Sequence, residues 1–206
     1  GRAGIGVDNI DLDAATARGI VVMNTPLGNS VTTAEHAIAM MAAMARQIPL
    51  ADHSTRAGKW EKSRFMGIEL CKKELGIIGC GNIGTIVATL ALGLKMRVIV
   101  YDPYLSPERA EALRVERVEL NELLARADVI TLHVPLTRET KGIIDGAALA
   151  KTKPGVFIVN CARGGLVVEA DLKSAIESGH IAGAALDVYE REPDVEPGLM
   201  KLDNVV

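Results

Sequence analysis

Three glycines at the spacing G-x-G-x-x-G are the first residues whose pattern could do chemistry. Gly79, Gly81 and Gly84 follow the apolar run 75–78 and open a stretch with helical periodicity. In a strand–turn–helix unit, the first glycine permits a tight turn, the second lets the backbone approach a pyrophosphate, and the third lets the helix pack closely on the strand. The helix N-terminus then offers free N–H groups and a positive dipole end to phosphates. The pattern predicts a dinucleotide site, although such a turn also occurs in other doubly wound folds.

A carboxylate after the next apolar run indicates which dinucleotide is bound. Asp102 follows residues 97–101 and is succeeded by Pro103 and Tyr104, not by an arginine. A carboxylate at this position accepts hydrogen bonds from ribose hydroxyls and repels a 2′-phosphate. We therefore expect NAD to be preferred over NADP.

Charged residues also follow two later apolar runs. Arg163 comes after residues 155–160, and Asp187 and Glu192 come after residues 182–186. Because ligands bind at the carboxyl ends of parallel strands, Arg163 could clamp a carboxylate bidentately there. Asp187 would lie near a nicotinamide pocket, and a buried carboxylate such as Glu192 could orient an imidazole and raise its pKa. A surface ion pair for Arg163 and exposed loop charges for the two acids remain the alternatives.

Composition excludes several classes of protein. The 206 residues are 49% hydrophobic and 24% charged, which is typical of a globular chain with a real core. A net charge of −3 and only 3% aromatic residues argue against a nucleic-acid partner. The longest apolar run, residues 37–45, is too short to span a membrane. The three cysteines fit neither a disulfide framework nor a metal knuckle, so we expect no metal site and a reducing, cytoplasmic setting.

The elements that must position these residues alternate along the chain. Short apolar runs predict strands, and stretches with apolar residues three and four apart predict helices that cover them. The expected strands are residues 75–78, 97–101, 128–133, 155–160 and 182–186, with a last one opening at Asn204. The expected helices are residues 82–94, 107–113, 120–127 and 169–178. This alternation is typical of a Rossmann-type α/β fold, a doubly wound parallel sheet.

A long Ala- and Met-rich helix is predicted over residues 32–47, before the alternating region. Thr32 and Glu35 have the spacing of a capping box, and Pro49 follows the end. A helix that is apolar on so much of its circumference must be buried on several sides, between domains or between subunits. Its three methionines at 40, 41 and 44 suit an adaptable subunit interface. Residues 1–23 do not fit the alternation, apart from a strand-like run at 20–23, and are interpreted as the tail of a preceding domain.

Several motifs together resemble the D-2-hydroxyacid dehydrogenase family. The resemblance covers essentially the whole chain, in one order, and rests on GRAGIGVDN at 1–9, NTP at 24–26, the turn at 79–84 with Asp102, HVPL at 133–136, NCARGG at 160–165 and ALDVYEREP at 185–193. It implies hydride transfer between NAD and a small phosphorylated 2-hydroxy acid. The methionines of the helix at 32–47 predict in addition a homo-oligomer formed through that helix. The resemblance also implies a remnant of a split substrate domain at 1–24 and an NAD-binding domain over 25–206.

The resemblance implies roles for particular residues. Arg163 would bind the substrate carboxylate and Glu192 would partner a catalytic histidine. Arg2, Ala3 and Gly4 would offer backbone N–H groups to the substrate. The residues implied to contact or line the cofactor site are Ile5, Gly79, Gly81, Asn82, Ile83, Gly84, Asp102, Val134, Cys161, Ala162, Arg163 and Asp187.

One departure from the family concerns the general base. The family places its catalytic histidine in a Pro-His-x-Gly stretch after the strand that begins at Asn204, and this chain stops before that stretch. Of the histidines present, His133 is expected to have a structural role, with a direct catalytic role as the alternative. His36 is expected to be buried in the long helix, and His53 and His180 to lie on the surface. Two rival functions remain: another dehydrogenase of the family, such as a glyoxylate or hydroxypyruvate reductase, and an NAD-sensing transcriptional corepressor built on the same fold.

Overall fold

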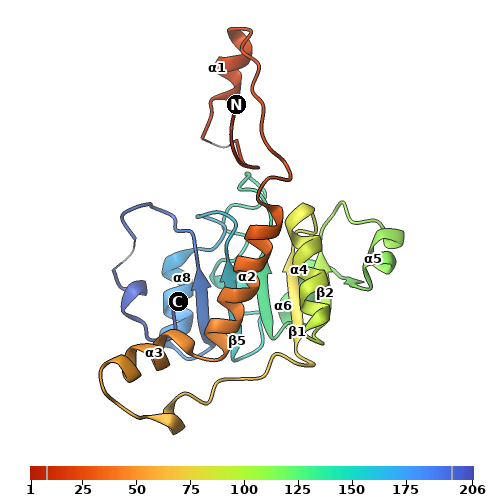
Figure 1. The fold of residues 1–206 in the computed structure, drawn as a ribbon. Coiled ribbons are helices and arrows are strands. Elements are labelled where there is room, and N and C mark those ends of the chain that lie inside the picture. Colours follow the sequence, from red (N-terminus) through yellow and green to blue (C-terminus); the bar gives the residue numbers. More distant parts are fainter. Residues whose placement is uncertain (8, 196) are drawn as a thin grey trace.

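A six-stranded parallel sheet forms the centre of the molecule (Figure 1). The computed structural model describes residues 1–7, 9–195 and 197–206, so Asp8 of the leading motif lies outside the described residues. The strand order is β3-β2-β1-β4-β5-β6, which confirms the expected Rossmann-type α/β architecture. The five predicted strands form within a residue or so of the expected limits, as Glu74–Ile78 (β1), Arg97–Tyr101 (β2), Val129–Leu132 (β4), Val156–Asn160 (β5) and Ile181–Leu186 (β6).

Helices cover both faces of this sheet, and each face has its own apolar core. On one face, α2 (Ser30–Ala45), α4 (Asn82–Gly93) and α5 (Pro107–Leu113) pack over the sheet. On the other, α6 (Leu120–Arg126), α7 (Gly146–Leu149) and α8 (Glu169–Glu177) do so. Because both faces are covered, every residue of β1 and β4 is buried, which explains why these strands are apolar apart from Glu74 and Thr131.

The long helix differs from its sequence prediction in two respects. It begins at Ser30 rather than Thr32, and Asn29 precedes it without a side-chain cap among the described residues, so the capping box of Thr32 and Glu35 is wrong. Gln47, at a φ of 54°, breaks the helix. Pro49 then stands in the first turn of a further helix, α3 (Ile48–Arg56), where its missing N–H is tolerated.

Several short elements escaped the sequence analysis. These are α1 (Leu12–Ala17), α3, α7, the two-residue edge strand β3 (Glu116–Arg117), and the 3₁₀ turns η1 (Lys62–Arg64) and η2 (Leu199–Lys201). They are too short for a periodic pattern to stand out. Residues 20–23 form no strand, and the strand expected from Asn204 is reduced to a single bridge between Val205 and Ala184.

The first 28 residues form an arm that projects from the sheet (Figure 1). Its two limbs run side by side: Arg2 N–H donates to the Met23 carbonyl at 2.8 Å, and Thr25 N–H donates to the Gly4 carbonyl at 3.1 Å. The returning limb leaves Val21, Met23 and Leu27 more than half exposed. The arm therefore has little core of its own and is held mainly by backbone hydrogen bonds.

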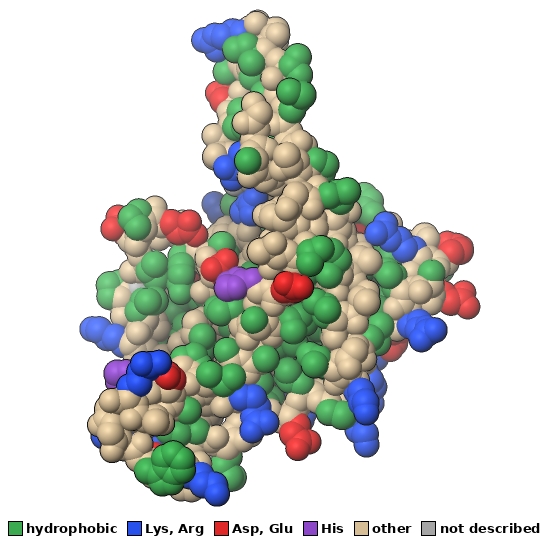
Figure 2. Space-filling model, viewed as in Figure 1, with side chains coloured by type: hydrophobic (Ala, Val, Ile, Leu, Met, Phe, Trp, Pro, Cys, Tyr) green, Lys and Arg blue, Asp and Glu red, His purple; other side chains and the backbone are tan. Residues whose placement is uncertain are grey.

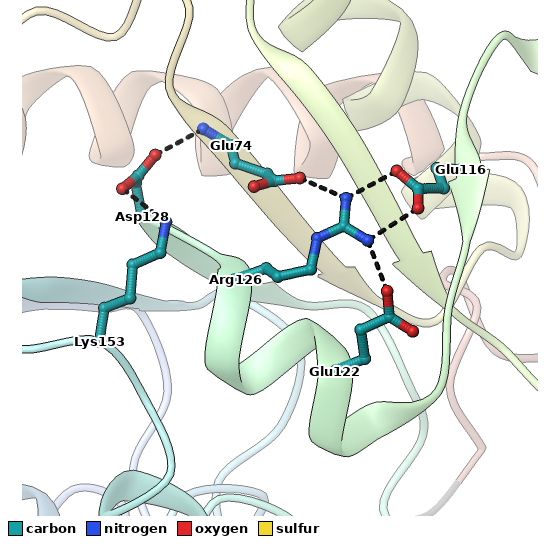
Figure 3. A network of polar contacts seen from close by, with 6 residues as sticks. All are labelled: Glu74, Glu116, Glu122, Arg126, Asp128 and Lys153. Carbon is teal, nitrogen blue, oxygen red and sulfur yellow. Dashed lines mark hydrogen bonds and ion pairs between the residues drawn. The ribbon is translucent and has the colours of Figure 1, made fainter.

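An ion-pair network joins the amino ends of β1 and β3 (Figure 3). The Arg126 guanidinium, at the end of α6, lies 2.7 Å from Glu74 on β1, 2.7 Å from Glu116 on β3 and 2.6 Å from Glu122. Hydrogen bonding to Arg126 lowers the pKa of the Glu116 carboxyl. Because Glu74 begins β1, this network anchors the edge strand β3 at the end of the sheet opposite the loops that follow the strands.

Candidate functional site

A large cavity of about 1300 Å³ opens at the carboxyl ends of the strands. The start of α4, the loops after β4, β5 and β6, the N-terminal arm and the first two turns of α2 all contribute to its wall. Of the residues expected from the sequence, it is lined by Arg2, Ala3, Gly4, Ile5, Asn82, Ile83, Val134, Cys161, Ala162, Arg163 and Asp187. The fold thus brings together residues from six separate segments at the edge where open α/β sheets bind ligands.

The glycine turn between β1 and α4 has the geometry that its spacing predicts. Gly79 has a φ of +95°, and a Cβ there would lie 2.7 Å from the His133 carbonyl oxygen. A Cβ on Gly84 would collide with the Gly79 carbonyl. Gly81, the N-cap of α4, is different: a Cβ there would meet no described atom within 4 Å. Gly79 and Gly84 are therefore required by the turn itself, whereas the space over Gly81 is free for a ligand.

Asp102 lies beside this turn, outside the wall of the cavity. Its Oδ2 accepts the Cys80 N–H at 2.7 Å, and its Oδ1 accepts the Tyr104 N–H at 2.8 Å. Each carboxylate oxygen has two lone pairs, so both can accept a further hydrogen bond. Asp102 therefore braces the glycine turn against the loop after β2 while keeping acceptor capacity for a ribose.

The loop that carries Arg163 is braced by the last residue of β5. The Asn160 side chain accepts the Ala162 N–H at 3.1 Å and donates to the Arg163 carbonyl at 2.9 Å. The guanidinium donates to the Ala162 carbonyl at 2.7 Å. A Cβ on Gly164 would collide with the Tyr189 carbonyl, so the loops after β5 and β6 are in close contact. This packing places Arg163 on the cavity wall together with Asp187.

The two acidic residues expected after β6, Asp187 and Glu192, have different surroundings in the structure. Asp187 lines the cavity, with its side chain 52% exposed and its Oδ1 3.3 Å from the Nε2 of His36. Glu192 does not line the cavity; its Oε1 accepts the Tyr189 N–H at 3.0 Å. Beside Asp187, burial and the carboxylate charge raise the pKa of the Cys161 thiol to about 12, so this thiol stays neutral.

The sequence analysis missed a polar face of α2 that lines the cavity. Asn29, Thr32, Thr33 and His36 lie there at spacings of three and four, which is one side of a helix. His36 had been expected inside a buried helix, but its side chain is 46% exposed. The signal was available in the sequence: four polar residues at helical spacing stand at the start of a helix whose later part is apolar.

His133, at the end of β4, is largely buried and also lines the cavity. Its Nε2 lies 2.9 Å from the Thr131 hydroxyl, and its Nδ1 has no partner among the described residues. Burial lowers the pKa of His133 from 6.5 to about 4, so the ring is neutral at pH 7. A neutral imidazole hydrogen-bonded to its own strand agrees with the structural role expected for it.

Because His133 takes up a proton less readily when folded than when unfolded, the protein should lose stability in acid. The contribution is fully present above pH 6.5 and declines as the pH falls toward 4, amounting to at most about 3 kcal/mol. Denaturant unfolding at several pH values should show that the free energy of unfolding declines less between pH 6.5 and pH 4 for His133→Gln than for the parent. Equal declines in both proteins would contradict this.

The fold and the cavity are those of a dinucleotide-binding domain, and comparison with known proteins gives its family. Residues 38–206 match the NAD-binding domain of the D-isomer specific 2-hydroxyacid dehydrogenases, and the chain belongs to that family. It is 57% identical over its whole length to D-3-phosphoglycerate dehydrogenase of Archaeoglobus fulgidus, and 50% identical to the enzyme of the same name from Synechocystis. The chain spans 39% and 37% of the length of these relatives.

Solved structures of other family members superpose closely on this chain. A glyoxylate reductase from Paecilomyes thermophila matches with a TM-score of 0.91 and 42% identity, covering 98% of this chain and 61% of the other. D-lactate dehydrogenase from Aquifex aeolicus, in complex with NAD and lactic acid, matches with a TM-score of 0.87 and 31% identity, covering 98% and 66%. Within the described residues, no helix is long and apolar enough to cross a membrane.

Proposed function

We propose that a protein containing this chain oxidises the C2 hydroxyl of 3-phosphoglycerate to 3-phosphohydroxypyruvate, the first step of serine biosynthesis. The observation that carries the proposal is the single cavity that unites the glycine-turn residues Asn82 and Ile83 with Arg163 and Asp187. Relatives that share the name D-3-phosphoglycerate dehydrogenase, at 50–57% identity over the chain, support the choice of substrate.

The residues around the glycine turn fit NAD. The free space over Gly81 is the cradle that a pyrophosphate needs, and the N–H groups at the start of α4 can bind it. The spare lone pairs of Asp102 can accept the adenosine ribose hydroxyls, and Asp187 can accept the nicotinamide amide. Ile5, Val134 and Cys161–Arg163 would line the remaining cleft. When bound, NAD supplies the nicotinamide ring that accepts the hydride.

The other residues act on the substrate. The Arg163 guanidinium would hold the substrate carboxylate and stabilise the negative charge that develops on the C2 oxygen. Arg2, Ala3 and Gly4 would add contacts to the carboxylate from the arm. Glu192 would orient the histidine that takes the hydroxyl proton, a step worth on the order of 10²–10⁴ in rate.

Turnover of 3-phosphoglycerate tests this proposal and separates its rivals. The assay uses a chimera in which this chain replaces its matching segment in the Archaeoglobus fulgidus relative, and follows NADH formation. A clear preference for 3-phosphoglycerate over glycolate and glycerate supports the proposal. A preference for glyoxylate or hydroxypyruvate in the reverse direction would identify a reductase, and no turnover of any of these would favour the corepressor.

Cofactor choice should depend on the charge of Asp102. We expect NAD to bind at least about tenfold more tightly than NADP, because the 2′-phosphate would face a carboxylate. Asp102→Asn removes the charge but keeps an oxygen acceptor for one of the two backbone N–H groups. It should therefore reduce the difference between the NAD and NADP affinities with little loss of NAD affinity. Calorimetry with both cofactors measures this, and equal affinity of the parent for both would overturn the assignment.

We also propose that two copies of the chain associate through α2. Met41 and Met44 are buried in the chain's own core, so they do not serve an interface as the sequence suggested, but Val31 and Ala39 are exposed and Met40 and Ala43 are only half-buried. Figure 2 shows apolar side chains gathered over α2 and α4.

A charge on α2 should therefore dissociate the dimer. Ala39→Glu should shift the chain to a smaller sedimentation coefficient, because a buried unpaired carboxylate is costly. Ala170→Glu on α8, an exposed alanine on the opposite face of the sheet, is the matched control and should have no effect. A parent that sediments as a monomer would refute the interface.

The chemistry of the cysteines supports a reducing compartment, which we propose to be the cytoplasm. Cys71, Cys80 and Cys161 are all free thiols, and Cys80 and Cys161 are buried.

A further inference from the structure

The contact between His36 and Asp187 has no part in the roles assigned above. The two residues lie far apart in the sequence, His36 on the second turn of α2 and Asp187 directly after β6. The fold brings the Nε2 of His36 to 3.3 Å from the Oδ1 of Asp187, and both side chains line the cavity. The contact therefore joins α2 to the loop that is proposed to hold the nicotinamide amide.

The Asp187 side chain needs an orienting partner if it is to bind an amide. Its backbone is fixed, because its N–H donates to the Asn160 carbonyl at 3.0 Å. Its carboxylate is half exposed, and such a side chain can adopt several rotamers when nothing holds it. A contact to one oxygen would restrict these rotamers and leave the other oxygen free to accept an N–H group of the carboxamide.

The surroundings of Asp187 make His36 the suitable partner. Cys161, close enough for the Asp187 charge to raise its pKa, is a buried neutral thiol and only a weak donor. His36 is carried by a helix whose inner face is packed on the sheet, with Ala34 and Ala37 on either side buried. The imidazole is therefore presented from a rigid element, which is what a positioning contact requires.

We infer that His36 is a positioning residue for Asp187: it fixes the carboxylate so that the nicotinamide amide meets a preorganised acceptor. This inference rests on the proposed function, specifically on Asp187 facing the nicotinamide. It assigns to α2, and not only to the loops after the strands, a part in recognising the reactive end of the cofactor. The adenosine end, bound at the glycine turn and Asp102, should be independent of His36.

The test compares NAD with ADP-ribose, which lacks the nicotinamide, by calorimetry on the chain. His36→Leu should weaken NAD binding about 5- to 10-fold and change ADP-ribose binding less than twofold. His36→Gln keeps an N–H donor and should recover part of the loss. Glu35→Gln, a change at the exposed neighbouring position on α2, is the matched control and should alter neither affinity. In an Asp187→Asn background, His36→Leu should change NAD affinity less than twofold, because the partner is already altered.

Each other outcome contradicts a different statement. If His36→Leu leaves both ligands unaffected or weakens both alike, His36 has no positioning role at the nicotinamide. If it weakens NAD equally with and without the Asp187 substitution, His36 contacts the cofactor directly and not through Asp187. If the parent chain binds neither ligand, the proposed function itself fails, whereas binding of both with no effect at His36 overturns only this inference.

Discussion

A chain carrying Gly81→Ala should fold like the parent and bind NAD on the order of 100-fold more weakly. The added methyl group meets no described atom within 4 Å, and the backbone at this residue is extended, with a negative φ of −72° and a ψ of −153° close to the β region that alanine adopts. The methyl group would instead occupy the space in which the pyrophosphate approaches the backbone. Calorimetry with NAD measures the loss, and denaturant unfolding should give a stability within about 0.5 kcal/mol of the parent.

Gly84→Ala is the matched variant with the opposite expectation. Its methyl group would collide with the Gly79 carbonyl, which is backbone and cannot rotate away. We therefore expect a destabilisation of roughly 1–3 kcal/mol from overpacking, together with weaker NAD binding because the turn must shift. If Gly81→Ala destabilised the chain as much as Gly84→Ala, or bound NAD like the parent, Gly81 would not mark the pyrophosphate site.

Replacement of Arg163 should abolish most turnover while leaving NAD binding nearly intact. In the chimera described above, we expect Arg163→Leu to lower kcat/KM for 3-phosphoglycerate by about 10²–10³-fold, the usual cost of removing a group that stabilises developing oxygen charge. Arg163→Lys should recover only part of the activity, because an ammonium group cannot form the bidentate fork. Steady-state kinetics with varied concentrations of 3-phosphoglycerate and NAD separate the effect on turnover from any effect on NAD binding.

Arg117→Leu provides the control for Arg163. Arg117 is an exposed arginine on the edge strand β3, far from the loop after β5 in the strand order, and its loss should leave kcat/KM unchanged. An Arg163→Leu chimera that retained full activity, or one that lost NAD affinity as strongly as activity, would show that Arg163 does not bind the substrate carboxylate.

The class of fold and the position of the glycine turn could be predicted from the amino-acid sequence alone. Strands buried on both faces are largely apolar, so the strands at 75–78 and 97–101 could be recognised from their apolar residues, although Arg97 at the start of the second strand is exposed. Gly79, Gly81 and Gly84 could also be recognised from the sequence. The need for glycine at these positions is local, because it comes from one turn between one strand and one helix. For the same reason Asp102 could be placed at the end of its strand without any knowledge of the packing.

Which side chains meet across the cavity depends on the tertiary packing of distant segments. Sequence periodicity shows that a helix is apolar on one face, but it does not show which loop the polar face of the helix will oppose. The sequence therefore predicts Thr32 as a cap and His36 as a core residue, whereas both line the cavity. Likewise Glu192, five residues after Asp187 in the sequence, does not line the cavity, and its Oε1 accepts the Tyr189 N–H. Contacts between residues distant in the chain, such as that of His36 with Asp187, depend on how α2 packs over the sheet, because that packing alone sets the distance between the helix and the ends of the strands.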